Sequence, residues 1–164
     1  MWNLNKMDGY DIAQICLNGH VISSMAGSSP SFRKDFCKEC GSKSIMHCQE
    51  CNKPIKGYYH VSGVIGGFHY YAPRFCDSCG NPFPWIKTKI ETAKELVLLI
   101  DSITEEEKQD FQESIVELVK ETAKVPIAKV KVKRYFSKID SDISDGIKDV
   151  LKDILNDKLK MEIL

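Results

Sequence analysis

The chain has 164 residues and equal numbers of basic and acidic side chains, 23 of each. Residues 1–83 hold 8 basic and 6 acidic side chains and residues 84–164 hold 15 and 17, so neither half attracts nucleic acid strongly. No apolar run reaches the roughly 18 residues of a membrane span, and the first ten residues lack the apolar core of a signal peptide. We therefore expect a cytoplasmic protein with no membrane segment.

All seven cysteines lie in the N-terminal half, and six of them form the CxxC pairs Cys37/Cys40, Cys48/Cys51 and Cys76/Cys79. In a reducing compartment such pairs are more often metal ligands than disulfides, and an odd number leaves one cysteine without a disulfide partner. A Gly or Asn follows each pair, and these two residues best tolerate the left-handed backbone of a turn around a metal. The pattern predicts bound Zn²⁺.

Two tetrahedral sites need eight ligands, so one ligand is missing from the seven cysteines. His20 follows Cys16 by four residues, and Asn18-Gly19 is a turn signal that would close a hairpin between them. We therefore predict two Zn²⁺ ions, one held by Cys16, His20, Cys37 and Cys40, and the other by Cys48, Cys51, Cys76 and Cys79. His47 is the rival eighth ligand, and an interleaved pairing of Cys37/Cys40 with Cys76/Cys79 is the alternative arrangement.

Between the last two pairs, rings flank the glycine-rich segment 63–67: Tyr58, Tyr59, His60, Phe68, His69, Tyr70, Tyr71 and Phe75. A hairpin that turns near Ile65 would place His60 opposite His69 or Tyr70. The rings could stack on nucleic-acid bases, with Lys56 and Arg74 near the phosphates. The alternative is cross-strand packing that stiffens a sheet with little core, and we favour it. Two histidines without a nearby carboxylate or spare cysteine are a weak basis for a third metal site.

The C-terminal half shows helical periodicity. Pro84 opens a stretch whose apolar residues recur every three or four positions, namely Ile86, Ile90, Ala93, Val97 and Ile100. Thr104 and Glu107 fit a capping box for a second helix, with Phe111, Ile115, Leu118 and Val119 on one face. A single last helix is expected from about Asp142 through Leu159.

Residues 129–133 alternate between Lys and Val as a strand does, but they lie between helical segments and have no expected strand partner. We predict a helix there. It carries the basic cluster Lys129, Lys131, Lys133, Arg134 and Lys138, which could contact phosphates or an acidic partner. Four aspartates follow at once, and a solvated helix face is the simpler interpretation.

The segment Pro73–Trp85 and the run Cys16-Leu17-Asn18-Gly19-His20 resemble a family of small uncharacterised bacterial proteins with a domain of unknown function. The resemblance implies a cytoplasmic zinc-ribbon protein with a helical tail and no established activity. We expect an α+β fold, with tandem zinc ribbons in residues 1–83 and a helical domain in residues 84–164.

No glycine-rich phosphate loop, HExxH or GxSxG motif occurs in the sequence. We therefore expect a non-enzymatic zinc-binding adaptor that contacts a protein partner or a second copy of itself. Nucleic-acid binding through the rings at positions 58–60 and 69–71, Arg74 and the basic cluster is the alternative.

Overall fold

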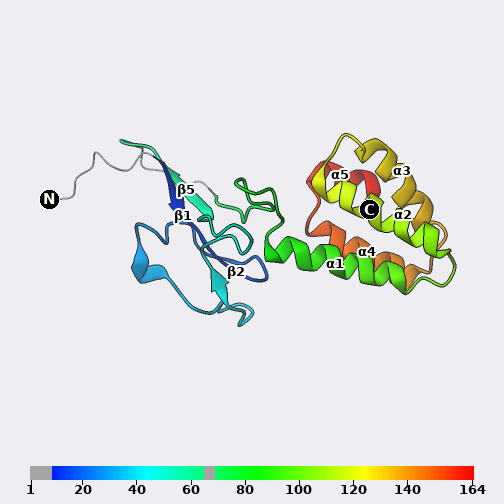
Figure 1. Cartoon of the computed structure of the whole chain (residues 1–164), viewed down its shortest axis with the longest axis horizontal. Helices are drawn as coiled ribbons and strands as arrows, with labels where there is room; N and C mark the ends of the chain where they lie inside the picture. The colour runs from blue at the N-terminus through cyan, green and yellow to red at the C-terminus, as the bar shows by residue number, and fades with distance from the viewer. Residues whose placement is uncertain (1–8, 65–68) are drawn as a thin grey trace. The chain divides into compact units, whose positions relative to one another are not determined.

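The computed structural model describes residues 9–64 and 69–164. The chain divides into two compact units, Met1–Ile86 and Lys87–Leu164. Small antiparallel sheets occupy the described part of the first unit, and helices form the second (Figure 1). The predicted α+β class is confirmed.

The described part of the first unit contains two small sheets. In one, β1 (Gly9–Ile12) pairs with β5 (Lys56–His60). The other has the order β3-β2-β4, formed by Val21–Ser23, Gln14–Cys16 and Ser44–Ile45. A short 3₁₀ turn, Pro30–Phe32, lies between β3 and β4 along the chain. Both sheets are antiparallel, and among these pairs only β2 and β3 are neighbours in the chain.

Close backbone packing joins β5 to the start of β2 and to the segment after β3. The N–H of Ala13 donates to Ile55 O and that of Tyr58 donates to Ser24 O, both at 2.8 Å. Gly57 lies at this contact, and a Cβ there would stand 2.1 Å from Ser24 O. Only glycine lets the two backbones approach this closely.

The sequence predicted the wrong partner for residue 60. We expected His60 opposite His69 or Tyr70, whereas β5 pairs with β1 and places His60 opposite Gly9. Residues 69 and 70 belong to no strand. The expected turn near Ile65, and Phe68, lie outside the described residues. The pairing was missed because strand partners 44 to 51 residues apart leave no local turn signal.

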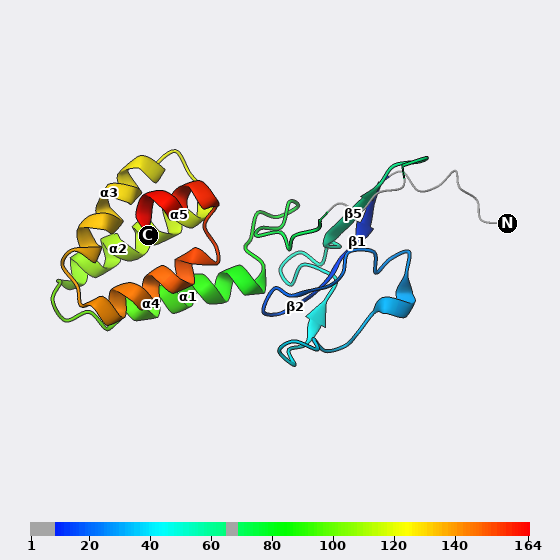
Figure 2. The ribbon, with the colours of Figure 1, turned by 180° about the vertical axis from the view of Figure 1, so that it is seen from behind.

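The second unit contains most of α1 (Pro84–Leu98), together with α2 (Glu105–Lys120), α3 (Val125–Phe136), α4 (Ser141–Lys152) and α5 (Asp157–Ile163). Helix α4 lies along α1, with Gly146 facing Leu96 (Figures 1 and 2). The Phe111 ring of α2 stacks on that of Tyr135 in α3, with centroids 4.7 Å apart. Phe111, Leu118, Val132 and Leu151 are completely buried in this unit.

Two predictions for the helices are confirmed and one is wrong. The capping box exists: Glu107 N–H donates to Thr104 Oγ1 at 3.2 Å, and Thr104 N–H donates to Glu107 Oε2 at 3.1 Å. Residues 129–133 are helical, within α3. The single last helix is wrong, because it breaks between α4 and α5. Asn156 caps the new helix by accepting the Leu159 N–H at 2.9 Å, and a polar side chain at that position favours a helix start.

Candidate metal centres

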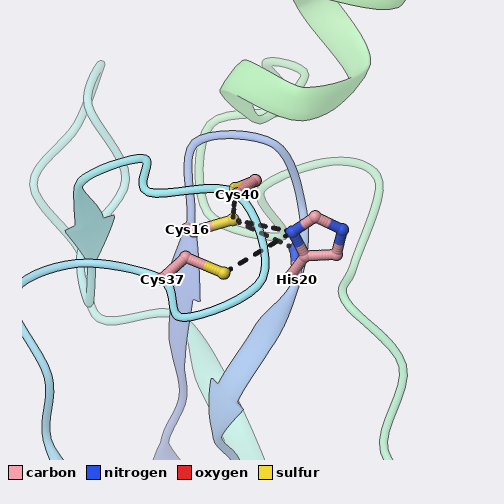
Figure 3. Close-up of side chains that lie close together, drawn as sticks. All are labelled: Cys16, His20, Cys37 and Cys40. Atoms are coloured by element: carbon pink, nitrogen blue, oxygen red, sulfur yellow. Dashed lines mark hydrogen bonds between the residues drawn. The ribbon is translucent and has the colours of Figure 1, made fainter.

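The first cluster gathers side chains from a hairpin and a CxxC turn. Cys16 ends β2, His20 precedes β3, and Cys37 and Cys40 come from the turn before β4 (Figure 3). His20 Nδ1 lies 3.5 Å from Cys16 Sγ and 3.6 Å from Cys37 Sγ, and the Cys16 and Cys40 sulfurs are 3.7 Å apart. The ring turns Nδ1 toward the sulfurs and its other nitrogen away from them (Figure 3).

The second cluster consists of four cysteines from two CxxC turns. The Cys48 and Cys79 sulfurs are 3.8 Å apart, and those of Cys51 and Cys76 are 3.7 Å apart. Ligands placed tetrahedrally at usual Zn–S and Zn–N lengths lie about 3.6 to 3.8 Å from one another. Both clusters have this spacing, so the residues fit a four-coordinate metal ion in each.

The three CxxC turns share one backbone design. In each, the N–H of the residue after the second cysteine donates to the carbonyl of the first, and the first cysteine's N–H donates to the carbonyl five residues on, all at 2.8–2.9 Å. The residue after the second cysteine has positive φ: 71° at Gly41, 57° at Asn52 and 74° at Gly80. The predicted need for Gly or Asn at this position is confirmed.

The same turns place N–H donors near the second sulfur of each pair, and in two of the three pairs the pKa of that sulfur is lowered. The backbone N–H and side chain of Ser42, with the Asn18 amide, lower the pKa of Cys40 to about 5. The Asn81 N–H lowers the pKa of Cys79 to about 7. Such donors stabilise the thiolate, which is the form that binds a metal. The loop geometry around Cys40 and Cys79 therefore favours the thiolate form of both side chains even without a bound ion.

Burial and neighbouring sulfurs raise the pKa of two other thiols, those of Cys16 and Cys51. Burial raises the pKa of Cys16, although the N–H groups of His20 and Asn18 lower it. At Cys51 the Lys53 N–H lowers the pKa, but burial and three neighbouring sulfurs outweigh it and raise the pKa to about 12. Four thiolates so close repel one another, and a divalent cation at their centre relieves that repulsion. The donor set is therefore suited to a metal.

The structure brings the eight predicted residues together in the two predicted groups of four. Within residues 9–64 and 69–164, His47 joins neither group, and Cys37/Cys40 does not join Cys76/Cys79. The spacing of four residues from Cys16 to His20, which completes a site otherwise one ligand short, favoured His20 over His47 in the sequence. The Asn18-Gly19 turn packs against Trp85, whose indole N–H donates to Pro73 O at 2.9 Å.

The predicted aromatic residues are distributed over several small contacts. Tyr59 forms an edge-to-face pair with Tyr10 of β1 at 4.8 Å, with Lys56 4.8 Å above the Tyr10 ring. Tyr58 lies 5.0 Å from the His60 ring, and His69 lies 4.7 Å from that of Tyr71. The Tyr70 hydroxyl donates to Lys56 O at 2.7 Å. Arg74 lies 5.9 Å from the Phe75 ring centre.

Ion pairs occupy much of the predicted basic cluster on α3. Lys131 lies 2.5 Å from Asp110, Lys138 lies 2.7 Å from Glu107, and Lys129 pairs with Glu162. Neither Lys133 nor Arg134 has a salt bridge to a described carboxylate. Three of the five cations therefore already have acidic partners.

Sequence reasoning missed the network around Asp11. This carboxylate is 3% exposed, and it accepts N–H groups from Ile12 and Gly27 at 2.7 and 2.8 Å. It also binds the Ser28 hydroxyl at 2.5 Å and His60 Nε2 at 2.9 Å. Burial alone would raise the pKa of Asp11, but the hydrogen bonds from Ser28 and His60 hold it below its usual value.

The Asp11 network has the residue types of a Ser-His-Asp triad in another order. In a triad the imidazole lies between the acid and the hydroxyl, whereas here the carboxylate lies between the other two. The group ties β1 to β5 and to the Gly27-Ser28 loop. No sequence motif signals it, because its members are 17 and 49 residues from Asp11.

None of the described helices is long and apolar enough to cross a membrane. Fold and site together define a class of protein in which two Cys/His clusters of metal-binding geometry precede a helical unit along the chain. The chain belongs to the family DUF2321, described as an uncharacterized protein conserved in bacteria, whose model matches residues 9–163. The resemblance inferred from the sequence is thus confirmed. No curated protein and no solved structure matches the chain.

Proposed function

We propose that this protein is a non-enzymatic, zinc-binding interaction module with two structural zinc ions. The observation that carries the proposal is the pair of four-ligand groups, each with all its ligand atoms within 4.8 Å of one another. A closed four-ligand shell leaves no position for water or substrate, so it supports structure and not catalysis. The order of the Asp11 network is also unlike that of a catalytic triad.

Zinc is the metal that best suits these ligands. Sets of four cysteines, or of three cysteines and one histidine, in tetrahedral geometry are typical of structural zinc sites. When bound, zinc would supply the cross-links that a unit with a small apolar core needs. A reducing cytoplasm would keep the thiols available for it.

An interaction role is supported by large aromatic side chains of the N-terminal unit that are exposed to solvent. Phe32 and Phe36 are 63% and 65% exposed, and Tyr71 is 76% exposed. Exposed rings on a rigid, metal-braced scaffold are suited to contact with another protein, because aromatic residues are enriched where proteins meet.

Metal analysis of the purified full chain tests the zinc proposal. We expect two zinc ions per chain by native mass spectrometry, and tetrahedral thiolate absorption when cobalt replaces zinc. Fewer than two ions in protein prepared without chelator, or a site that exchanges water after cobalt loading, would contradict it. Iron in place of zinc would overturn the choice of metal.

A second candidate function, single-stranded nucleic-acid binding, rests on the Tyr10–Tyr59 pair. These rings are 59% and 49% exposed and lie on one small sheet beside Lys56. A stacked base gains about 1–3 kcal/mol from such a ring. Against this role, Lys56 is already 2.5 Å from Asp77, and three of the five cations of the basic cluster are paired.

Binding to labelled single-stranded RNA and DNA at low salt tests this second function. If it is correct, Tyr59→Ala weakens binding at least fivefold, and the matched change Phe32→Ala, elsewhere in the unit, has no effect. Absence of binding by the zinc-loaded wild type at low salt excludes it.

A further inference from the structure

Strand β3 forms an edge of its sheet. It pairs with β2 on one side, and no described strand pairs with its other side. An edge strand presents backbone N–H and C=O groups that a further strand can bond. Such edges are a common place for an extended peptide to add to a sheet.

A groove of about 650 Å³ follows this strand. The five consecutive residues 20–24 line it, together with residues from the segment 32–39. The three residues of β3, Val21–Ser23, span about 10 Å, which is enough to pair with the central residues of a short docked strand. Phe32 and Phe36 belong to this lining, and both are mostly exposed. The groove thus combines a strand edge with two accessible rings.

The polar groups of the groove favour a negatively charged occupant. Lys34 lines it and forms no salt bridge with a described carboxylate. Lys38 also lines it, and its only described partner is the exposed, sequence-adjacent Glu39 at 3.5 Å. Exposed pairs of this kind are weak and exchange readily. Two lysines against one glutamate leave the groove positive.

His20 adds a hydrogen-bond donor to the same groove. Its Nδ1 faces the cysteine sulfurs and its Nε2 points away from them (Figure 3). A metal on Nδ1 leaves the proton on Nε2, and metal-bound histidines normally donate that N–H to a carbonyl or carboxylate. No acceptor for Nε2 is found among the described residues.

We propose that this groove binds an extended, acidic segment of a partner protein, which adds as a strand along β3. Apolar side chains of the segment contact Phe32 and Phe36, its acidic side chains face Lys34 and Lys38, and one of its oxygens accepts the His20 Nε2–H. The proposal names the partner class for the interaction module above and rests on that function. It also makes binding depend on the metal in the first cluster.

An array of seven-residue peptides tests the proposal with the zinc-loaded full chain. The test peptides alternate Asp or Glu with Phe, Leu, Ile or Val. One control set replaces the acids with Lys, and another keeps the composition but groups the apolar residues together. Retained peptides are then labelled and titrated in solution by fluorescence anisotropy. We expect retention of the alternating acidic set and at least tenfold weaker binding of both control sets.

Variants locate the binding surface. Lys34→Glu and Phe36→Ser should each weaken binding about tenfold, which is the usual scale for a charge reversal or a lost aromatic contact at an interface. The control changes Lys53→Glu and Leu99→Ser alter a lysine and an exposed apolar residue outside the groove and should leave binding unchanged. Zinc content is measured for every variant, so a folding defect is recognised by metal loss.

Several results would overturn the proposal. They are retention of no acidic peptide, equal retention of the basic set, or unchanged binding by Lys34→Glu with two zinc ions bound. A wild type that dimerises through this groove, and becomes monomeric with Lys34→Glu, would assign the edge to a second copy instead. The zinc content is interpreted independently of these results. Two zinc ions without peptide binding would refute only the proposed peptide-binding role of the groove. Fewer than two zinc ions would refute the proposed zinc-binding module.

Discussion

Completely buried large side chains are divided unequally between the two units. Among the described residues, the N-terminal unit contributes Ile15, Ile55 and Cys16, whereas the helical unit contributes nine, including Phe111, Leu118 and Leu151. A domain with so small an apolar core usually needs cross-links or metals to fold. The comparison teaches that side-chain packing holds the second unit, whereas the first unit has little core and instead carries two clusters whose geometry could hold metal ions.

The largest effect is expected at a ligand. His20→Ala leaves three sulfurs at the first cluster and should remove one zinc ion per chain, with a loss of about 4 kcal/mol or more in the stability of the first unit. His47→Ala is the matched control and should keep both ions, since His47 belongs to neither cluster of described residues. Native mass spectrometry and thermal unfolding of both variants provide the measurement. Loss of a metal from His47→Ala alone would reverse the ligand assignment.

A core truncation should affect the other unit. Phe111→Ala removes a completely buried ring that stacks on Tyr135, and should destabilise the helical unit by about 3–5 kcal/mol. Met161, which is 89% exposed, offers the control Met161→Ala, for which we expect less than about 0.5 kcal/mol. Urea unfolding followed by far-UV circular dichroism measures both. The zinc content of Phe111→Ala should stay at two ions per chain. Loss of zinc from this variant would show that the metal sites depend on the packing of the helical unit.

A smaller effect is expected at the start of α2. Thr104→Ala removes the hydroxyl that accepts the Glu107 N–H and should cost about 1 kcal/mol. Thr104→Ser retains the acceptor and should be close to wild type. The same urea titration measures both variants, and equal stability of Thr104→Ala and Thr104→Ser would show that the capping bond contributes nothing.

A further effect of similar size depends on pH. Lys131, and to a lesser extent Tyr135, hold the pKa of Asp110 below its usual value although burial opposes them. A depressed folded-state pKa stabilises the fold above the unfolded-state value of about 3.9, and the contribution is lost as pH falls through the folded-state pKa. Because Asp110 is 35% exposed, Asp110→Asn should cost only about 1 kcal/mol at pH 7.

Stability of Asp110→Asn and wild type, measured by urea unfolding from pH 7 down to pH 2, checks this prediction. The difference should shrink below about pH 4. A constant difference down to pH 2 would show that the carboxylate charge is not its source.

Local patterns explain why so much of the metal centres could be predicted. The CxxC turns close through bonds between residues at most five apart, and Gly41, Asn52 and Gly80 signal the positive φ they need. The capping box at Thr104 is equally local. The break at Asn156 was missed although its polar side chain lies in the sequence, because the apolar periodicity continues through it to Leu159.

Features made by distant residues could not be predicted. The pairing of β1 with β5 and the Asp11 network join residues up to 51 positions apart without a turn or motif between them. The groove along β3 has walls from two segments and depends on which edge of the sheet remains unpaired. Periodicity and spacing in the sequence indicate which residues share one face of an element or one turn. They do not indicate which elements pack against one another.

The contrast between the units is tested most directly by the ¹H–¹⁵N NMR spectrum of the zinc-loaded chain before and after all zinc is removed by a chelator under reducing conditions. We predict that the amide signals of residues 9–64 and 69–86 collapse to unfolded positions, while those of residues 87–164 keep their dispersion. An N-terminal unit that stays folded without zinc, or a helical unit that unfolds with it, would contradict the claim that metal holds the first unit and packing holds the second.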